Sequence, residues 1–145
     1  MELFTIGFTQ KTAQTFFEQL ASNNVECLVD IRLHPDGQLA GFSKKNDLQY
    51  FLRELIDCDY RHIELLAPSD EILKDYRSDK NWQKYEQVYL ELMGQRGVPD
   101  ALDRNLFESK KCCLLCSELT AEHCHRRLAA ELIHEKWSGF SIIHL

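Results

Sequence analysis

The 145-residue chain lacks any apolar run close to the roughly 20 residues that a transmembrane helix requires. Residues 1–7 also lack the basic segment and the apolar core of a signal peptide. We therefore expect no membrane partner and a cytoplasmic protein.

Glycine and proline are scarce, with six and three residues respectively. No stretch rich in either residue forms a linker, and the chain has no internal repeat or low-complexity segment. A chain of this length buries about two-thirds of its unfolded surface, which is enough for one hydrophobic core. Residues 1–145 are therefore expected to form a single domain.

An excess of positive charge is also missing, since the formal net charge is −6. Nucleic-acid binding depends on neutralising phosphates, so we expect no extensive nucleic-acid surface. The chain contains no phosphate-binding loop and no dinucleotide-binding motif, and no cofactor can be assigned from it. Its six cysteines, without a secretion signal, are expected to be free thiols, ligands or catalytic groups instead of a disulfide framework.

Apolar strand-like segments alternate with amphipathic helical ones along the chain. This alternation predicts an α/β fold, a three-layer domain with a mostly parallel central sheet and helices on both faces. Asn46 is a good N-cap for one of the helices. The expected strands lie near 2–6, 25–31, 60–63, 111–116 and 140–144, and the expected helices cover 11–20, 46–56, two pieces of 68–96, and a segment that begins near 120.

Two cysteine motifs surround the turn between the strand at 111–116 and the helix after it. Cys116-Ser117-Glu118 ends the strand, and Cys124-His125-Arg126 follows after a short gap. Two thiols, a carboxylate, an imidazole and a guanidinium supply a nucleophile, an acid or base, and an anion clamp. A thiol beside Arg126 and a helix N-terminus is expected to have a lowered pKa. The sequence thus indicates the location of a reactive site more clearly than the type of reaction.

Polar groups also follow the first two expected strands. Gly7 ends the first strand, and Asp30 and Arg32 end the second. Since ligands of open parallel sheets bind beyond the carboxyl ends of the strands, these groups are expected to meet the cysteine motifs in one cleft. Gly7 also fits a close backbone approach, and Asp30 with Arg32 also fits a structural ion pair. Ser43 is a weaker candidate from the loop that follows.

Arg126 is expected in the first turn of its helix, where a positive charge opposes the helix dipole. Helix stability therefore does not explain the arginine at this position. Binding of an anion, together with free backbone N–H groups, does explain it. Either Cys116 or Cys124 should react fastest with a thiol reagent at neutral pH. Cys58, at a helix end, would also react if it were exposed.

The chain resembles the bacterial and archaeal family called domain of unknown function 488 over nearly its whole length. Many members have a Ser-Arg pair after the proline where this chain has Asp36-Gly37, so no role of that serine is transferred. The resemblance supports the fold and the site, and implies no particular reaction. The matching segments are 5–9, 28–32 with Pro35, 41–44, Trp82 with Tyr85-Glu86 and Tyr89, 113–118 and 124–126.

The first functional hypothesis is an enzyme that acts on a small anionic substrate, phosphate-like or nucleotide-like. The alternative is a metal site made of Cys116, Cys124 and His125; Cys113 is excluded because an extended strand points it away from Cys116. A redox pair of Cys116 with Cys124 and a non-catalytic interaction module also stay open, as does the oligomeric state. The candidate catalytic residues are Cys116, Glu118, Cys124, His125 and Asp30, and the candidate substrate-binding residues are Gly7, Arg32, Ser43 and Arg126.

Overall fold

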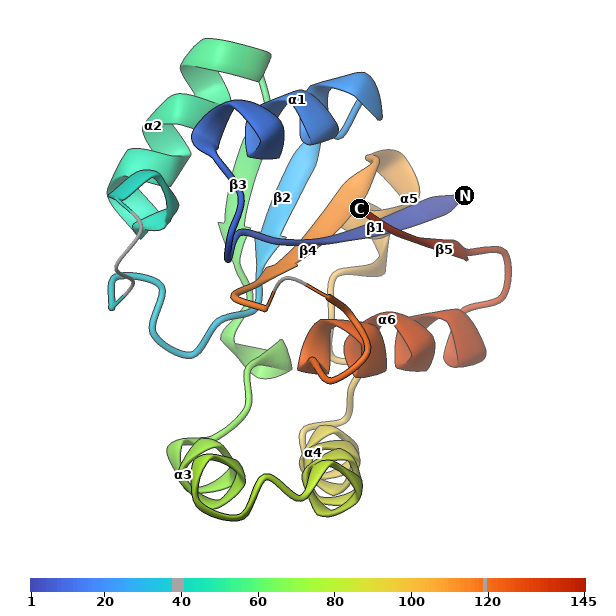
Figure 1. Ribbon diagram of the computed structural model, residues 1–145. Coiled ribbons are helices and arrows are strands. Elements are labelled where there is room, and N and C mark those ends of the chain that lie inside the picture. Colours follow the sequence, from blue (N-terminus) through green and yellow to red (C-terminus); the bar gives the residue numbers. More distant parts are fainter. Residues whose placement is uncertain (38–40, 119) are drawn as a thin grey trace.

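The computed structural model describes residues 1–37, 41–118 and 120–145. At its centre lies a five-stranded parallel sheet with the strand order β3-β2-β4-β1-β5 (Figure 1). The strands are β1 (Glu2–Gly7), β2 (Cys27–Asp30), β3 (Asp59–His62), β4 (Cys112–Cys116) and β5 (Ser141–His144).

Helices cover both faces of this sheet, which confirms the predicted three-layer α/β architecture (Figure 1). One face packs against α1 (Ala13–Ser22) and α2 (Lys45–Ile56). The other packs against α4 (Trp82–Gln95), α5 (Arg104–Ser109) and α6 (His125–Lys136), and α3 (Asp70–Asp79) lies beside α4. Short 3-10 turns occupy Gly41–Ser43 and Glu64–Leu66. Within the described ranges no helix combines the length and the apolar character needed to cross a membrane.

The strand β4 supplies both cores because its side chains alternate between the two faces of the sheet. Cys112 and Leu114 belong to the core under α4 and α6, whereas Cys113 and Leu115 belong to the core under α1 and α2. All residues of β4 are buried. The order of the strands explains this, since β4 lies between β2 and β1 and has a helical layer on each side.

The helix α2 begins earlier than its sequence predicts. Asn46 is not its N-cap, because Lys44 occupies that position and the helix begins at Lys45. The backbone N–H of Lys45 donates to the carbonyl of Pro35 at 3.2 Å. A tertiary contact therefore satisfies one of the unpaired N–H groups in the first turn of α2, where no side chain forms a capping hydrogen bond.

The helix α6 begins later than expected, at His125 instead of near residue 120. The segment before it is fixed to the ends of the strands. Thr9 N donates to the Ser117 carbonyl at 3.0 Å, and the Arg126 side chain donates to the Glu118 carbonyl. These bonds hold the segment across the end of β1, where it cannot coil into a first helical turn.

Candidate functional site

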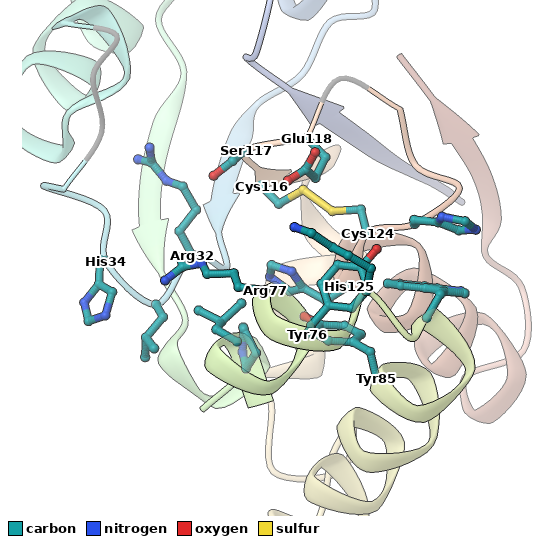
Figure 2. A pocket seen from close by; sticks show the side chains of 16 residues that line it. Arg32, His34, Tyr76, Arg77, Tyr85, Cys116, Ser117, Glu118, Cys124 and His125 are labelled. Carbon is teal, nitrogen blue, oxygen red and sulfur yellow. A yellow bond between two sulfur atoms is a disulfide. The ribbon is translucent and has the colours of Figure 1, made fainter. Parts of the chain in front are cut away.

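A cavity of about 340 Å³ lies where the sequence predicts a cleft, beyond the carboxyl ends of β2 and β4 (Figure 2). Three parts of the chain line it: the loop after β2, the α3–α4 hairpin, and the segment from the end of β4 to the start of α6. The parallel register explains why they meet, because Gly7 pairs with Cys116 and Asp30 pairs with Leu115. The ends of β2 and β4 reach the cavity through Arg32 and Cys116, whereas Gly7 and Asp30, which the sequence also placed in the cleft, do not line it.

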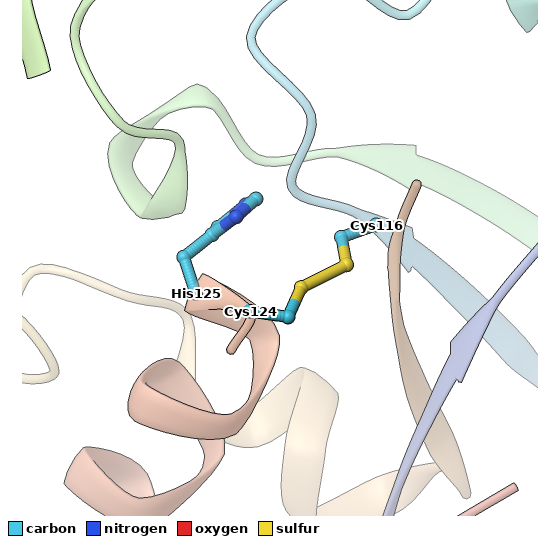
Figure 3. A group of neighbouring side chains, drawn as sticks. All are labelled: Cys116, Cys124 and His125. Carbon is cyan, nitrogen blue, oxygen red and sulfur yellow. A yellow bond between two sulfur atoms is a disulfide. The ribbon is translucent and has the colours of Figure 1, made fainter. Parts of the chain in front are cut away.

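Cys116 and Cys124 form a disulfide in the wall of the cavity (Figure 3). Cys116 is the last residue of β4, and Cys124 is the N-cap residue of α6. The four other cysteines are free and buried, as expected of a chain without a disulfide framework. Cys58 is among them, so the suspicion that it is an exposed competitor is wrong: the chain after α2 turns inward, and only 3% of this residue is exposed.

His125 lies next to the disulfide and is held by the backbone of the neighbouring strand. Its Nε2 lies 2.8 Å from the carbonyl oxygen of Ile31. A carbonyl oxygen only accepts, so Nε2 carries the proton and Nδ1 of the neutral ring carries the lone pair. Burial lowers the pKa of His125 from 6.5 to about 4, although part of the ring reaches the cavity. A neutral imidazole beside two sulfur atoms can accept a proton or bind a metal ion.

Arg126 does not line the cavity but lies beneath it. The side chain is 1% exposed, and its Nη1 donates to the Glu118 carbonyl and lies 3.3 Å from the sulfur of Cys116. Gly7 provides the space: a Cβ atom there would collide with the Glu118 carbonyl oxygen and lie 2.6 Å from Arg126 Nη1. Gly7 thus serves a close backbone approach, and the Arg126 charge is placed to stabilise a thiolate at Cys116.

Asp30 and Arg32 form a buried ion pair at the end of β2. Asp30 accepts from Arg32 Nε at 2.9 Å, from Arg32 Nη2 at 2.7 Å, and from the Tyr60 hydroxyl at 2.5 Å. Burial and the neighbouring Asp30 raise the pKa of Tyr60 well above its usual value. Both carboxylate oxygens are occupied, so this geometry favours the structural interpretation of the pair. Arg32 Nη1, however, is buried and has no hydrogen-bond partner among the described residues, and Arg32 lines the cavity.

The remaining candidates divide between the cavity and the protein interior. Glu118 is exposed and lines the cavity, whereas Ser43 is fully buried and does not line it. Two cations that the sequence analysis missed, Arg77 of α3 and Lys80 at its C-cap, are exposed in the cavity wall. Among the residues that the structure describes, neither takes part in an ion pair. Their spacing at a helix end resembles that of ordinary surface charges, which is why no sequence signal pointed to them.

The structure is thus a three-layer α/β fold with a cavity at the carboxyl edge of its sheet. The model of the family described as domain of unknown function DUF488 matches residues 12–133, and the chain belongs to this family. The motifs that suggested the resemblance include the cysteine segments around the cavity. The chain shows no significant match to a curated protein or to a solved structure.

Replacing Arg126 by Ala should destabilise the protein by about 3 kcal/mol, since it removes a large buried side chain and the donor to the Glu118 carbonyl. Urea denaturation measures this. The contacts of the neighbouring Arg127 lie at the surface: ion pairs with Glu86 and Glu131, a hydrogen bond to the Glu122 carbonyl, and a position over the Trp82 ring. Arg127→Ala is therefore the matched control and should cost about 1 kcal/mol. Equal losses in the two variants would contradict an anchoring role for Arg126.

Alkylation of the native protein at neutral pH should label few cysteines, because the free ones are buried and burial raises the pKa of Cys58 to about 12. After mild reduction, Cys116 and Cys124 should react first because only this pair lines the cavity. Peptide mapping by mass spectrometry identifies the labelled residues. Labelling of Cys58 ahead of the pair would show that the cavity does not control thiol reactivity.

Acidification should reduce the stability of the protein between pH 6.5 and about 4 through His125. Its pKa is lower in the folded than in the unfolded chain, so the unfolded chain binds the extra proton in this window and stability falls as the pH falls. The loss is at most about 3.5 kcal/mol, at roughly 1.4 kcal/mol per pKa unit. In His125→Gln this part of the pH dependence should vanish, whereas His34→Gln, at an exposed position, should keep it. If the stability of wild type and of His125→Gln depended on pH in the same way, His125 would not be the group responsible.

Proposed function

We propose that this domain is an enzyme that binds a small anionic molecule, phosphate-like or nucleotide-like, in the cavity and acts on it with Cys116, Cys124 and His125. One observation supports this most strongly. Two cations without ion-pair partners among the described residues, Arg77 and Lys80, share a cavity with two sulfur atoms and an imidazole.

The charge of the cavity favours an anion as the ligand. The chain as a whole has a net charge of −6, yet the side chains that line the cavity include Arg77 and Lys80, against the single carboxylate of Glu118. Arg32 lines the cavity as well, but Asp30 balances its charge. The N-terminus of α6 lies at the same cavity and adds a partial positive charge. An anion would thus enter a locally positive site on a negatively charged protein.

The chemistry of the cavity favours a reaction over simple binding. Reduction of the Cys116–Cys124 disulfide produces two thiols beside a neutral imidazole, and thiolates are both nucleophiles and metal ligands. Arg126 stabilises negative charge on the Cys116 sulfur, and Nδ1 of His125 can accept the proton that a thiol loses. The reduced protein is therefore the active form in this proposal.

A double replacement of the two cations should weaken anion binding about tenfold, which corresponds to roughly 1.4 kcal/mol. The variant is Arg77→Ala with Lys80→Ala, and the measurement is calorimetric titration of reduced, metal-free protein with pyrophosphate and a panel of nucleotides. The control variant, Arg53→Ala with Lys74→Ala, removes two cations that do not line the cavity, and its affinity should match the wild type.

Two results would contradict the proposal. Equal affinity loss in the control variant would mean that net charge, and not the cavity, governs binding. If neither pyrophosphate nor any of the nucleotides binds, the proposed class of substrate is wrong. Turnover of a bound anion, followed by phosphorus NMR, should require reduction of the disulfide and be lost in His125→Gln.

A further inference from the structure

We propose that the reduced site binds a zinc ion through Cys116, Cys124 and His125, with the fourth position of the ion open toward the cavity. The inference deepens the proposed function, on which it rests for the role of the metal, but the binding itself can be measured without any substrate.

The three donor groups already converge. One ligand atom from each of Cys116, Cys124 and His125 lies within 4.8 Å of the others (Figure 3). They come from two elements, the end of β4 and the start of α6, which the Arg126 contact to the Glu118 carbonyl fixes relative to each other. A metal ion therefore needs a small separation of the two sulfurs and no rearrangement of the fold.

Burial distinguishes a metal site from a lone nucleophile. Only 1% of Cys116 and 3% of Cys124 is exposed, so both sulfurs are largely withdrawn from water although they line the cavity. Two buried thiolates also need compensating charge, and a divalent cation between them supplies it. A nucleophilic mechanism needs one thiolate and one base, which leaves the second cysteine without a role in the reduced protein, whereas a metal site uses all three groups.

The second coordination sphere is also present. Histidines that bind metals generally donate their other ring N–H to a carboxylate or a backbone carbonyl. Nε2 of His125 does this with Ile31 at 2.8 Å, so coordination through Nδ1 leaves that hydrogen bond intact. Arg126 Nη1, at 3.3 Å from the Cys116 sulfur, can donate to a metal-bound thiolate as well.

The donor set specifies the class of metal. Two thiolates and one imidazole are typical of tetrahedral zinc, and three protein ligands with one open position are typical of catalytic sites. All three ligands line the 340 Å³ cavity together with Arg77 and Lys80. An anion attracted by these cations would therefore be able to reach the open position of the ion, or the water bound there.

Metal binding and the disulfide exclude each other. A trialkylphosphine opens the disulfide: the phosphine supplies two electrons and becomes its oxide, water supplies that oxygen, and the two protons of the water end on the sulfurs. Zinc then replaces these two protons, which pass to the buffer. A phosphine is preferable to a dithiol as the reductant, because a dithiol would itself bind zinc.

The experiment titrates phosphine-reduced wild-type protein anaerobically with Co²⁺, whose thiolate charge-transfer and tetrahedral d–d bands report the ligands. We expect one Co²⁺ per chain, loss of the bands when Zn²⁺ displaces it, and no bands in the oxidised protein. Cys116→Ser, Cys124→Ser and His125→Asn should each lose the charge-transfer band or shift it with at least tenfold weaker affinity. Elemental analysis of the zinc-loaded, desalted protein checks the stoichiometry.

Two matched variants test whether the site is specific. His123→Asn removes an exposed histidine of the same cavity, and Cys58→Ala removes a thiol outside it, so both should bind Co²⁺ as the wild type does. Reduced wild type that keeps its far-UV circular dichroism but shows no charge-transfer band would overturn the proposal. So would full loss of binding in His123→Asn. Because anion binding is measured on metal-free protein, either proposal can fail while the other stands.

Discussion

The geometry of the site depends on the hydrogen bond that the buried guanidinium of Arg126 donates to the Glu118 carbonyl. A charged side chain withdrawn from water is costly unless its donors are satisfied, and here the Glu118 carbonyl accepts from Nη1. That bond pulls the segment after β4 over the end of β1, into space that Gly7 leaves open. Cys124 is brought back beside Cys116 as a result, although the chain has already left the sheet.

A second buried arginine fixes the other side of the same edge. Arg32 turns back onto Asp30, and the Tyr60 hydroxyl of β3 is a further donor to that carboxylate. The carbonyl that orients His125 belongs to Ile31, which lies between the two partners of this ion pair. The position of the imidazole therefore depends on how rigidly β2 ends, and the Asp30–Arg32 pair provides that rigidity.

The sequence predicts β1, β2 and β4 well because these strands are short, largely apolar and buried. The signal for β3 is weaker, because this strand is polar and partly exposed. The sequence also predicts that Cys116 and Cys124 meet, since only seven residues separate them around one turn. It fails where tertiary contacts override local signals. The bond from Lys45 to Pro35 fixes the start of α2 without a capping side chain, and the loop contacts delay the start of α6.

Charged residues were the hardest to place from the sequence. Arginine is almost never fully buried, so Arg126 was expected in contact with ligand instead of beneath the site. Arg77 and Lys80 present the opposite difficulty, because an exposed cation on a helix has the same sequence signature whether or not a cavity lies beside it. Only the packing of the α3–α4 hairpin over the end of the sheet distinguishes these two from other surface charges.

The cavity has two walls of different origin. The sulfurs and the imidazole belong to the sheet and to α6, whereas Tyr76, Arg77 and Lys80 belong to a hairpin inserted between β3 and β4. Substitutions in the inserted wall change the shape and charge offered to a ligand without moving the sulfur atoms. Ligand preference and reactivity can therefore diverge independently among proteins that share this architecture.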